Sequence, residues 1–459
     1  MNKTENINLD IKILNDIAKD IDKNNGRTFF VGGYVRDKLL KLESKDIDVE
    51  VFGIEINNLR KILLKYGNIN EFGNKFGILK LTGTNIEFSI PRKEKSIGEK
   101  HQDFEIDIDP HLSLISASKR RDFTMNALME DVLTGEIIDN WNGKEDIENK
   151  VIRHIDDSTF IQDELRVLRA CQFAARFNFK ISDETIKLCK KIDCSNLPKE
   201  RIYTELEKAL LYSKKPSIFF EYVRQIGLLD KIFKPLDKLI GLKQNPIYHP
   251  EGDVWNHTMM VLDEGANIKE KSNYPICLML SCICHDLGKI TTTRIKNGKI
   301  ISYDHENQLH LTDKFLKNIT DNKDLITSVK ILVRNHMRPN VIAKNNSSNK
   351  AIRKLIVDTS GKLVDIKDAI LLSKADRLGR SINNMSEEDL EKWWEDKLSE
   401  INNKETKIIP FITGHDLIDL GFTPNKEFGD ILDYAFKLQI DGFDKEAIIN
   451  KIIRNKKNG

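Results

Sequence analysis

The chain lacks an excess of charge of either sign. Its 459 residues include 73 lysines and arginines against 71 aspartates and glutamates, which gives a formal net charge of +2. This balance excludes the bulk basicity that marks many nucleic-acid-binding proteins. The sequence also shows no platform of aromatic residues on which bases stack. Any surface that binds a nucleic acid must therefore be local.

Long apolar runs and cysteine pairs are absent as well. No stretch reaches the roughly 18 apolar residues that a membrane-spanning helix requires. The opening segment lacks the cationic start and apolar core of a signal peptide. The six cysteines show no CxxC spacing of the zinc or redox kind, so we expect them to be buried apolar residues. These absences predict a cytoplasmic protein without a membrane partner.

The hydrophobic pattern divides the chain into a mixed α/β part and a mostly helical remainder. Between about residues 27 and 140, strand-like and helix-like patterns alternate, and FGILKLTGTNIEFSI predicts a hairpin that turns at residues 82–84. From about residue 160 onward, apolar residues recur at intervals of three and four, as in amphipathic helices. Prolines and glycines gather between residues 235 and 256 and indicate a boundary between helical domains.

The first candidate catalytic residues lie in SKDIDVEVFG, residues 44–53. Side chains alternate faces along a strand, so Asp46 and Asp48 share one face. An isolated pair of this kind is more typical of an edge strand with a solvated face. Glu87, in NIEFSI, has a strand position from which it can join the pair, although a solvent-facing glutamate fits there too. Three carboxylates on one face repel one another unless cations hold them, and hard oxygen ligands suit Mg²⁺.

A pair of glycines upstream is suited to a nucleotide phosphate. Gly32 and Gly33 end a strand just before a helix, where backbone N–H groups and the helix dipole favour an anion. Arg36 adds a cation one turn later. Most Gly-Gly turns are merely tight connections, so this feature gains weight only beside the carboxylates.

A third segment, KRRDFTMNAL, opens another helix with charged and polar groups. Arg121, Asp122 and Asn126 can hold a triphosphate and a ribose hydroxyl there. A capped helix start with surface charges is the alternative interpretation.

These segments occur in a recognisable order, and with others they resemble a known superfamily. GGYVRDKLL, KDIDVEV, IEFSIPR, RRDFTMNAL, LTGEIIDNWNGKEDI, QDELRVLRACQFAARF and ERIYTELEKAL follow one another as in the class II tRNA nucleotidyltransferases and bacterial poly(A) polymerases. The chain is similar to the CCA-adding enzymes of this superfamily. The similarity covers about residues 27–235.

The resemblance implies a polymerase β-like head in which Asp46 and Asp48 bind two Mg²⁺ ions and Glu87 completes the catalytic set. In such a site one ion activates the RNA 3′-hydroxyl for attack on the α-phosphate, and the other steadies the pyrophosphate. The remaining implied contacts are to the nucleotide, with Gly32, Gly33, Arg36 and Arg121 at the triphosphate and Asp122 and Asn126 at the ribose 2′-hydroxyl.

Base choice is implied by the segment QDELRVLRACQ. Asp163 and Arg166 lie three residues apart on one helical face, so they can present an acceptor and paired donors together. In the family the matching helix reads the base of CTP and then of ATP, and Arg169 shares its face. A plain surface salt bridge is the alternative. Gln162 stands where the family usually has glutamate, and Gln172 where arginine is common, which leaves the preference between C and A open.

The polar segment 93–118 resembles the loop that the family uses to switch to ATP. Enzymes that add only CC have this loop shortened. Its presence favours CCA or A addition.

A second cluster of candidate ligands follows in the helical part. A lone buried histidine is usually a satisfied core residue, but neutral imidazoles and carboxylates from several helices suit a divalent transition ion or Mg²⁺. The pattern H…HD…D resembles the HD metal-dependent phosphohydrolase domain, here about residues 250–380, in which Lys289 contacts a phosphate. A catalytically idle HD fold that binds tRNA is the alternative. The implied metal ligands are His257, His285, Asp286 and Asp376, with His305 and His336 between them.

The sequence therefore predicts an α+β protein. A polymerase β-like nucleotidyltransferase α/β head takes residues 1–150, a helical base-recognition and RNA-binding domain 151–240, an all-α HD domain 241–390, and a helical tail 391–459. The resemblance implies CCA addition from CTP and ATP to the tRNA 3′ end, with HD phosphohydrolase activity. An A-adding or CC-adding enzyme, a poly(A) polymerase, and an HD phosphohydrolase with an inactive RNA-binding head stay open. The sequence does not indicate an oligomeric state.

Overall fold

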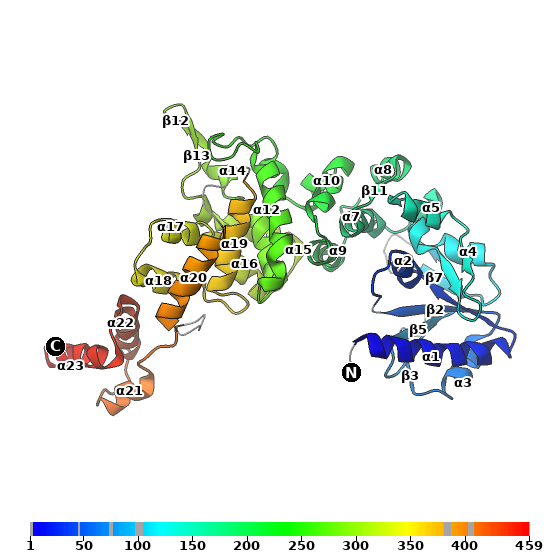
Figure 1. Cartoon of the computed structure of the whole chain (residues 1–459), viewed down its shortest axis with the longest axis horizontal. Helices are drawn as coiled ribbons and strands as arrows, with labels where there is room; N and C mark the ends of the chain where they lie inside the picture. Colours follow the sequence, from blue (N-terminus) through cyan, green and yellow to red (C-terminus); the bar gives the residue numbers. More distant parts are fainter. Residues whose placement is uncertain are drawn as a thin grey trace. The chain divides into compact units, whose positions relative to one another are not determined.

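The computed structural model describes residues 3–44, 46–72, 77–96, 104–380, 387–402 and 408–458. Its internal contacts divide the chain into unit 1, residues 1–205 with 221–227, and unit 2, residues 206–220 with 228–459. Figure 1 shows a sheet in the N-terminal part of the chain and mainly helices in the rest. No helix within the described residues has the length and apolar character that a membrane crossing requires.

Unit 1 is built on a seven-stranded sheet with the spatial order β3-β4-β5-β2-β1-β8-β9. Strand β2 runs parallel to β5 and antiparallel to β1, and Asp48 of β2 is directly beside Glu87 of β5. The sheet strands are β1 (Arg27–Val31), β2 (Ile47–Phe52), β3 (Ile69–Phe72), β4 (Ile78–Leu81), β5 (Ile86–Ser89), β8 (Met129–Asp131) and β9 (Ile137–Ile138).

One face of the sheet carries a hydrophobic cluster and the side chain of Asp48. On this face, Phe29, Val31 and Phe52 pack against Ala117 of helix α4 (Leu114–Lys119). Side chains two residues apart in a strand share a face, so Asp48 lies on the side where Phe52 enters this core. The same packing that buries the aromatic residues therefore presents the carboxylate of Asp48 at the edge of the core.

Short helices and turns complete unit 1. Helix α3 buries Leu59, Ile62 and Leu63 and leaves its charged face to solvent. Helices α9 and α10 contribute residues to both units. The remaining elements are α1 (Lys3–Asp22), α2 (Gly33–Leu39), α3 (Ile56–Leu63), β6 (Arg92–Ser96), β7 (Phe104–Ile108), η1 (Thr124–Asn126), α5 (Gly143–Glu148), β10 (Val151–Ile152), α6 (Asp157–Phe160), α7 (Leu165–Phe177), β11 (Lys180–Ile181), α8 (Asp183–Cys189), α9 (Lys199–Tyr212) and α10 (Ser217–Ile226).

Unit 2 is a helical bundle around α13, with a helical tail. Every residue of α13 from Ile276 to Cys284 is buried, as expected for a helix that is apolar on all sides. Its main elements are α11 (Leu229–Ile232), η2 (Leu236–Leu239), α12 (Val254–Ile268), η3 (Lys269–Lys271), α13 (Pro275–Cys284), α14 (Lys289–Thr292), β12 (Arg294–Lys296), β13 (Lys299–Ile301), η4 (His305–Asn307), α15 (Leu309–Ile319), α16 (Lys323–Asn335), α17 (Arg338–Lys344), α18 (Asn349–Thr359), α19 (Ile366–Leu378), α20 (Glu387–Asn402), α21 (Gly414–Asp419), α22 (Phe428–Asp441) and α23 (Lys445–Asn458).

Most of the coarse expectations are confirmed. The α/β head and the mostly helical remainder are present, and β4 and β5 form the hairpin expected around residues 82–84. All six cysteines are buried and free. In the polar segment 93–118, β6 and β7 pair antiparallel, and residues 97–103 between them lie outside the described part.

The core of α3 provides a stability test with a matched control. Leu59 is fully buried, whereas Leu64, at the end of the same helix, is 56% exposed. We expect Leu59→Ala to lower the free energy of unfolding of unit 1 by roughly 2–5 kcal/mol, because it removes packed methyl groups. Leu64→Ala should change it by less than about 0.5 kcal/mol. Chemical denaturation followed by circular dichroism measures both, and equal effects of the two variants would contradict this packing.

Candidate functional site

Three carboxylates meet on the sheet of unit 1. Asp48 and Glu87 are register partners on parallel strands, and Asp46 comes just before β2 begins at Ile47. Partial burial raises the pKa of Asp48 above its ordinary value, and the neighbouring carboxylates of Glu87 and Asp46 add to the shift while Arg121 opposes it. Such a cluster gains stability from bound cations, so the residues fit a Mg²⁺ site.

Lys80 is a cation that the sequence did not single out. It lies opposite Glu87 across the β4–β5 pair, and its Nζ is 2.7 Å from Glu87 Oε1. Its position follows from the hairpin register, two residues before the predicted turn begins. Lys80 therefore compensates part of the negative charge on the open side of the cluster.

A buried glutamate anchors the arginines beside these carboxylates. Glu50 is fully buried, and its Oε1 accepts a hydrogen bond of 2.9 Å from Arg120 while its Oε2 lies 3.6 Å from Arg121. A side chain on Gly32, which has a φ of +66°, would come within 3.0 Å of Arg121 Nη1. Gly32 thus leaves room for Arg121. One concave surface is lined by Val31, Asp48, Ile78, Glu87, Phe88, Ser89, Arg92, Arg120 and Arg121.

The predicted ribose and base residues form one buried network. Asp122 Oδ1 accepts a hydrogen bond of 2.9 Å from Asn126, and its Oδ2 accepts one of 2.8 Å from Arg169. Burial would raise the pKa of Asp122, but Arg169 and Asn126 outweigh it and hold that pKa below its ordinary value. Asn126 Oδ1 in turn accepts a hydrogen bond of 2.6 Å from Arg36. The structure brings these four predicted residues together.

Arg36 is placed differently from the expectation of a phosphate ligand. Its side chain is only 4% exposed, its Nε donates to Asp37 at 2.8 Å, and its guanidinium lies over the ring of Phe177. The side chain is folded inward because these two partners and Asn126 surround it. Arg36 therefore orients Asn126 within the network. Gly33, predicted to contact the triphosphate, is the first residue of α2.

The proposed base-reading pair is also placed differently. Helix α7 begins at Leu165, whose backbone N–H donates to the carboxylate of Asp163 at 3.1 Å, and Arg166 is the second residue of the helix. Asp163 lies two residues before the helix. It is paired with Arg201 of α9 at 3.1 Å, while the guanidinium of Arg166 donates to two backbone carbonyls.

The two glutamines that depart from the family pattern have different surroundings. Gln162 is exposed in the turn before α7. Gln172 is 1% exposed, and its Nε2 has no hydrogen-bond partner among the described residues. Arg201, by contrast, was not expected at this site. Its segment ERIYTELEKAL was recognised only as a motif, without a role for its side chains.

Unit 2 gathers histidines and aspartates from five helical elements into one buried centre. Such a set of imidazole and carboxylate ligands is typical of metal centres. Two groups of three ligand atoms could each hold an ion, because the atoms within each group lie within 4.8 Å of one another. The first group comes from His257, His285 and Asp376, and the second from Asp286, His305 and His336.

The backbone determines which nitrogen of each ring faces the centre. The Nδ1 atoms of His285, His305 and His336 lie 2.9, 2.8 and 2.7 Å from backbone carbonyl oxygens. A carbonyl only accepts, so each Nδ1 carries the proton and each Nε2 presents a lone pair. The Nε2 atoms of His305 and His336 face each other at 3.3 Å, and that of His285 is buried without a hydrogen bond. Facing lone pairs fit a bound metal ion.

The fourth histidine is oriented by a carboxylate. His257 Nδ1 lies 2.9 Å from Oε1 of the buried Glu251, and its Nε2 lies 3.0 Å from Asp376 Oδ1. A carboxylate behind a metal-ligating histidine fixes the ring and raises its basicity. Arg380 contacts the other oxygen of Asp376 at 2.7 Å. Glu251 and Arg380 thus support the ligands from behind.

The surroundings shift the pKa values of these groups in both directions. Burial alone would lower the pKa values of His257 and His305, but the carboxylates of Asp376 and Glu251 beside the first and of Asp286 beside the second raise them above the ordinary value. Burial, together with the neighbouring His285 and His305, lowers the pKa of His336 to about 3. Burial would raise the pKa of Asp286, but His285 and Lys289 hold it well below its ordinary range. A neutral imidazole and an ionised carboxylate are the forms that ligate a metal.

Two residues of this centre were not predicted from the sequence, Glu251 and Arg380. The H…HD…D pattern supplies the four predicted ligands, and the structure brings them together with His305 and His336, the two histidines noted between them. The two supporting residues carry no such signal. Lys289, predicted to contact a phosphate, is 2.7 Å from Asp286 Oδ2.

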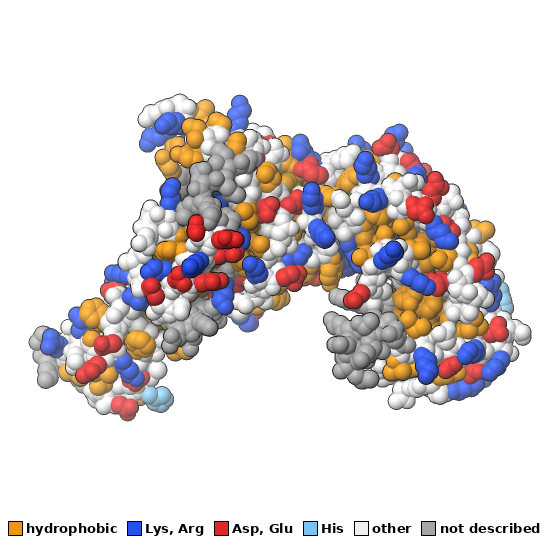
Figure 2. Space-filling model, viewed as in Figure 1, with side chains coloured by type: hydrophobic (Ala, Val, Ile, Leu, Met, Phe, Trp, Pro, Cys, Tyr) orange, Lys and Arg blue, Asp and Glu red, His pale blue; other side chains and the backbone are white. Residues whose placement is uncertain are grey.

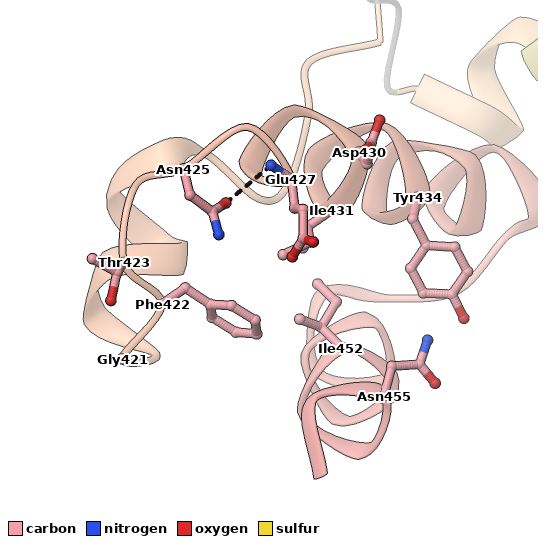
Figure 3. A pocket seen from close by; sticks show the side chains of 10 residues that line it. All are labelled: Gly421, Phe422, Thr423, Asn425, Glu427, Asp430, Ile431, Tyr434, Ile452 and Asn455. Atoms are coloured by element: carbon pink, nitrogen blue, oxygen red, sulfur yellow. Dashed lines mark hydrogen bonds between the residues drawn. The ribbon is translucent and has the colours of Figure 1, made fainter. Parts of the chain in front are cut away.

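A separate concavity of about 670 Å³ lies in the C-terminal tail (Figure 3). Phe422 and Ile452 point into it from opposite sides, and Asn425 caps the turn before α22 by accepting the N–H of Glu427. Nearby, Asp416 of α21 completes a capping box with Thr413. This concavity therefore lacks the ligand chemistry of the two sites above.

The buried anchor Glu50 generates a test of the head site. We expect Glu50→Gln to lower the free energy of unfolding of unit 1 by roughly 3 kcal/mol, because Arg120 and Arg121 lose a buried anion. Glu71→Gln, which breaks an exposed ion pair with Arg60, should cost less than about 1 kcal/mol. Urea denaturation measures both variants. A negligible effect of Glu50→Gln would contradict the anchoring role.

Comparisons with known proteins cover most of the chain. The family model described as Poly A polymerase head domain matches residues 28–153. The model described as probable RNA and SrmB-binding site of polymerase A matches residues 178–240, and the HD domain model matches residues 254–381. The relationship that the motifs indicate is thereby confirmed for three successive parts of the chain.

Curated relatives match more than half of the chain. A multifunctional CCA protein of Actinobacillus pleuropneumoniae is 37% identical over 273 residues, which are 58% of this chain and 64% of that protein. A multifunctional CCA protein of Laribacter hongkongensis is 34% identical over 270 residues, with shares of 58% and 64%. The match therefore spans slightly less than two thirds of these relatives.

Solved structures of CCA-adding enzymes share the fold. The enzyme of Bacillus stearothermophilus in complex with CTP superimposes with a TM-score of 0.67 at 17% identity, covering 97% of this chain and 98% of that one. The Thermotoga maritima enzyme complexed with tRNA gives 0.58 at 21% identity, with coverages of 97% and 95%. The three domain matches show a poly(A) polymerase head domain, a polymerase A RNA-binding segment and an HD domain in succession, and the superpositions show that the chain shares the fold of CCA-adding enzymes.

Proposed function

We propose that this protein adds CCA to the 3′ end of tRNA, using CTP and ATP and releasing pyrophosphate. The observation that carries this proposal is the register of β2 and β5, which sets Asp48 beside Glu87 with Asp46 and Arg121 close by. The similarity to multifunctional CCA proteins supports the choice of substrate. The proposal includes a cytoplasmic location, where tRNA is available.

Magnesium is the proposed cofactor of the head. Asp46, Asp48 and Glu87 would hold it, because neighbouring carboxylates repel one another unless a cation lies between them. When bound, two such ions would activate the attacking 3′-hydroxyl and neutralise the charge that develops on the pyrophosphate. Glu50 keeps the guanidinium of Arg121 at the edge of this cluster, where it can attract the triphosphate.

Selection of the nucleotide is proposed for the buried network behind the cluster. Asn126 is held between Asp122 and Arg36, which fixes the direction of its amide. A fixed amide or carboxylate can distinguish a ribose 2′-hydroxyl from its absence, because an unpaired buried polar group is costly. Asp163 and Arg166 stay candidates for reading the base, and opening of the Asp163–Arg201 ion pair would free the carboxylate to accept from cytosine or adenine.

The deciding experiment offers purified protein three tRNAs that end in the discriminator base, in CC, and in CCA. CTP and ATP are supplied separately and together. We expect two C residues from CTP alone, one A on the CC end, and no extension of the CCA end. Addition of A only, or of CC only, would identify a partial enzyme. An untemplated run of A residues would overturn the proposal in favour of poly(A) addition.

The role of the carboxylates has its own test. Asp48→Ala should reduce nucleotide addition by at least about 1000-fold. The metal ions would lose a ligand and would no longer neutralise the charge on the transferring phosphoryl group. Asp22→Ala removes an exposed carboxylate of the same unit and should leave the rate unchanged. Single-turnover incorporation of labelled CTP measures both. Unchanged addition by Asp48→Ala would favour an HD phosphohydrolase with an inactive head.

We propose a second activity, hydrolysis of phosphate esters, for the centre in unit 2. The specific observation is that the Nε2 lone pairs of His285, His305 and His336 converge in a buried space beside two ionised aspartates. Four histidines and two carboxylates exceed the needs of one ion, so two positions that share Asp286 fit the set. Such ions activate a water molecule for attack on phosphorus, and Lys289 lies beside them to attract the phosphate.

Metal content tests this centre independently of activity. We expect the double variant His305→Ala, His336→Ala to bind one divalent transition ion fewer per chain than the unaltered protein, because it loses two ligands of one position. His310→Ala removes an exposed histidine of the same unit and should bind the full number. Mass-spectrometric metal analysis after saturation and dialysis gives the numbers. Equal metal content in all three proteins would contradict the two-ion arrangement.

A further inference from the structure

A small hairpin lies between two potential metal ligands of unit 2 in the sequence. Strands β12 and β13 pair antiparallel between α14 and η4. The chain enters the hairpin shortly after Asp286 and leaves it at His305, so potential metal ligands lie at both of its ends. Figure 1 shows the hairpin standing away from the surrounding helices.

The hairpin carries only positive charge. From Leu287 to Tyr303 the sequence contains no acidic residue. The three residues of β12, which include Arg294 and Lys296, are exposed, as is Lys299 at the start of β13. Within the described part of the chain, none of these three cations forms an ion pair. In a protein with a net charge of only +2, this is a local excess of cations.

Exposed apolar surface accompanies the cations. Ile295 is 77% exposed and Tyr303 is 64% exposed. Figure 2 shows cationic and hydrophobic side chains together on this projecting part. Unpaired cations next to an exposed aromatic ring are suited to a nucleic acid strand, because phosphates bind the cations and a base can stack on the ring.

The hairpin contacts the metal centre through hydrogen bonding to His305. The backbone carbonyl of Ser302 accepts the hydrogen bond from Nδ1 of His305 and so orients that ring. Its hydroxyl is 2.8 Å from that of Thr293, which closes the base of the hairpin. A side chain on Gly288 would clash with the carbonyl of His305, so the two ends of the hairpin pass in direct contact. The hairpin therefore cannot move without shifting His305.

We propose that the β12–β13 hairpin is an arm that binds the phosphates of an RNA strand and leads its 3′ end to the metal centre. The arm therefore acts on an RNA chain rather than on a free small ester. This inference rests on the proposed phosphohydrolase activity. The choice of RNA follows from the unpaired cations beside an exposed tyrosine, and from the continuity of the arm with His305.

The test compares two triple variants of the full chain. Arg294→Ala, Lys296→Ala, Lys299→Ala removes the cations of the arm. Lys314→Ala, Lys323→Ala, Lys367→Ala removes three exposed lysines from the helices of the same unit. The probes are a short RNA with a 2′,3′-cyclic phosphate end and the small diester bis(p-nitrophenyl) phosphate. KM and kcat are measured for each at several salt concentrations.

We expect the arm variant to raise KM for the RNA by roughly 10- to 100-fold at 0.1 M salt and to lower the salt slope of binding by about 2, from three lost phosphate contacts. Its kcat/KM for the small diester, and both constants of the control variant, should stay within about twofold. An unchanged KM for RNA in the arm variant, or an equal rise in the control variant, would overturn the proposal. An equal loss on RNA and on the small diester would also overturn it, as it would indicate a purely structural role.

Failure of the proposed activity gives a different result. If the unaltered protein hydrolyses neither probe with any divalent ion, the phosphohydrolase proposal fails. The arm is then tested by binding of the same RNA alone, followed by photo-crosslinking. Crosslinks at β12–β13 that the arm variant abolishes would support an RNA-binding arm without hydrolysis, whereas crosslinks only elsewhere would overturn it.

Discussion

The parallel pairing of β2 with β5 is the constraint on which the head depends. It places Asp48 and Glu87 side by side, so their charges cannot separate without breaking the sheet. Nearby cations offset this repulsion. They are Lys80 and the two arginines that Glu50 holds, Arg120 and Arg121. The backbone thus stores an unfavourable arrangement of charge that bound metal ions and a triphosphate relieve.

The centre in unit 2 uses the same physical principle with different groups. Backbone carbonyls hold the Nδ1 protons of three histidines, which forces their Nε2 lone pairs toward one another. Glu251 and Arg380 support the remaining ligands from behind. In both units, backbone pairing and structural hydrogen bonds bring together groups that fit a bound cation.

Sequence patterns predict the parts of this account that depend on local periodicity. The α/β head, the β4–β5 hairpin, the shared face of Asp46 and Asp48, and the four HD-pattern residues are all visible in the sequence. Pairing across the sheet is not, because no local signal says which strand neighbours β2, and so the burial of Glu50 was missed. The inward position of Arg36 was not predicted, since its partner Asn126 is 90 residues away in the chain.

The most direct measurement of the central claim is the number of Mn²⁺ ions that the head binds beside an unreactive CTP analogue. Electron paramagnetic resonance of the unaltered protein and of Asp48→Asn separates the head from the centre in unit 2, since the variant alters only the head. The account predicts a spin-coupled Mn²⁺ pair that depends on the analogue and disappears in Asp48→Asn. Identical spectra from the two proteins would contradict it.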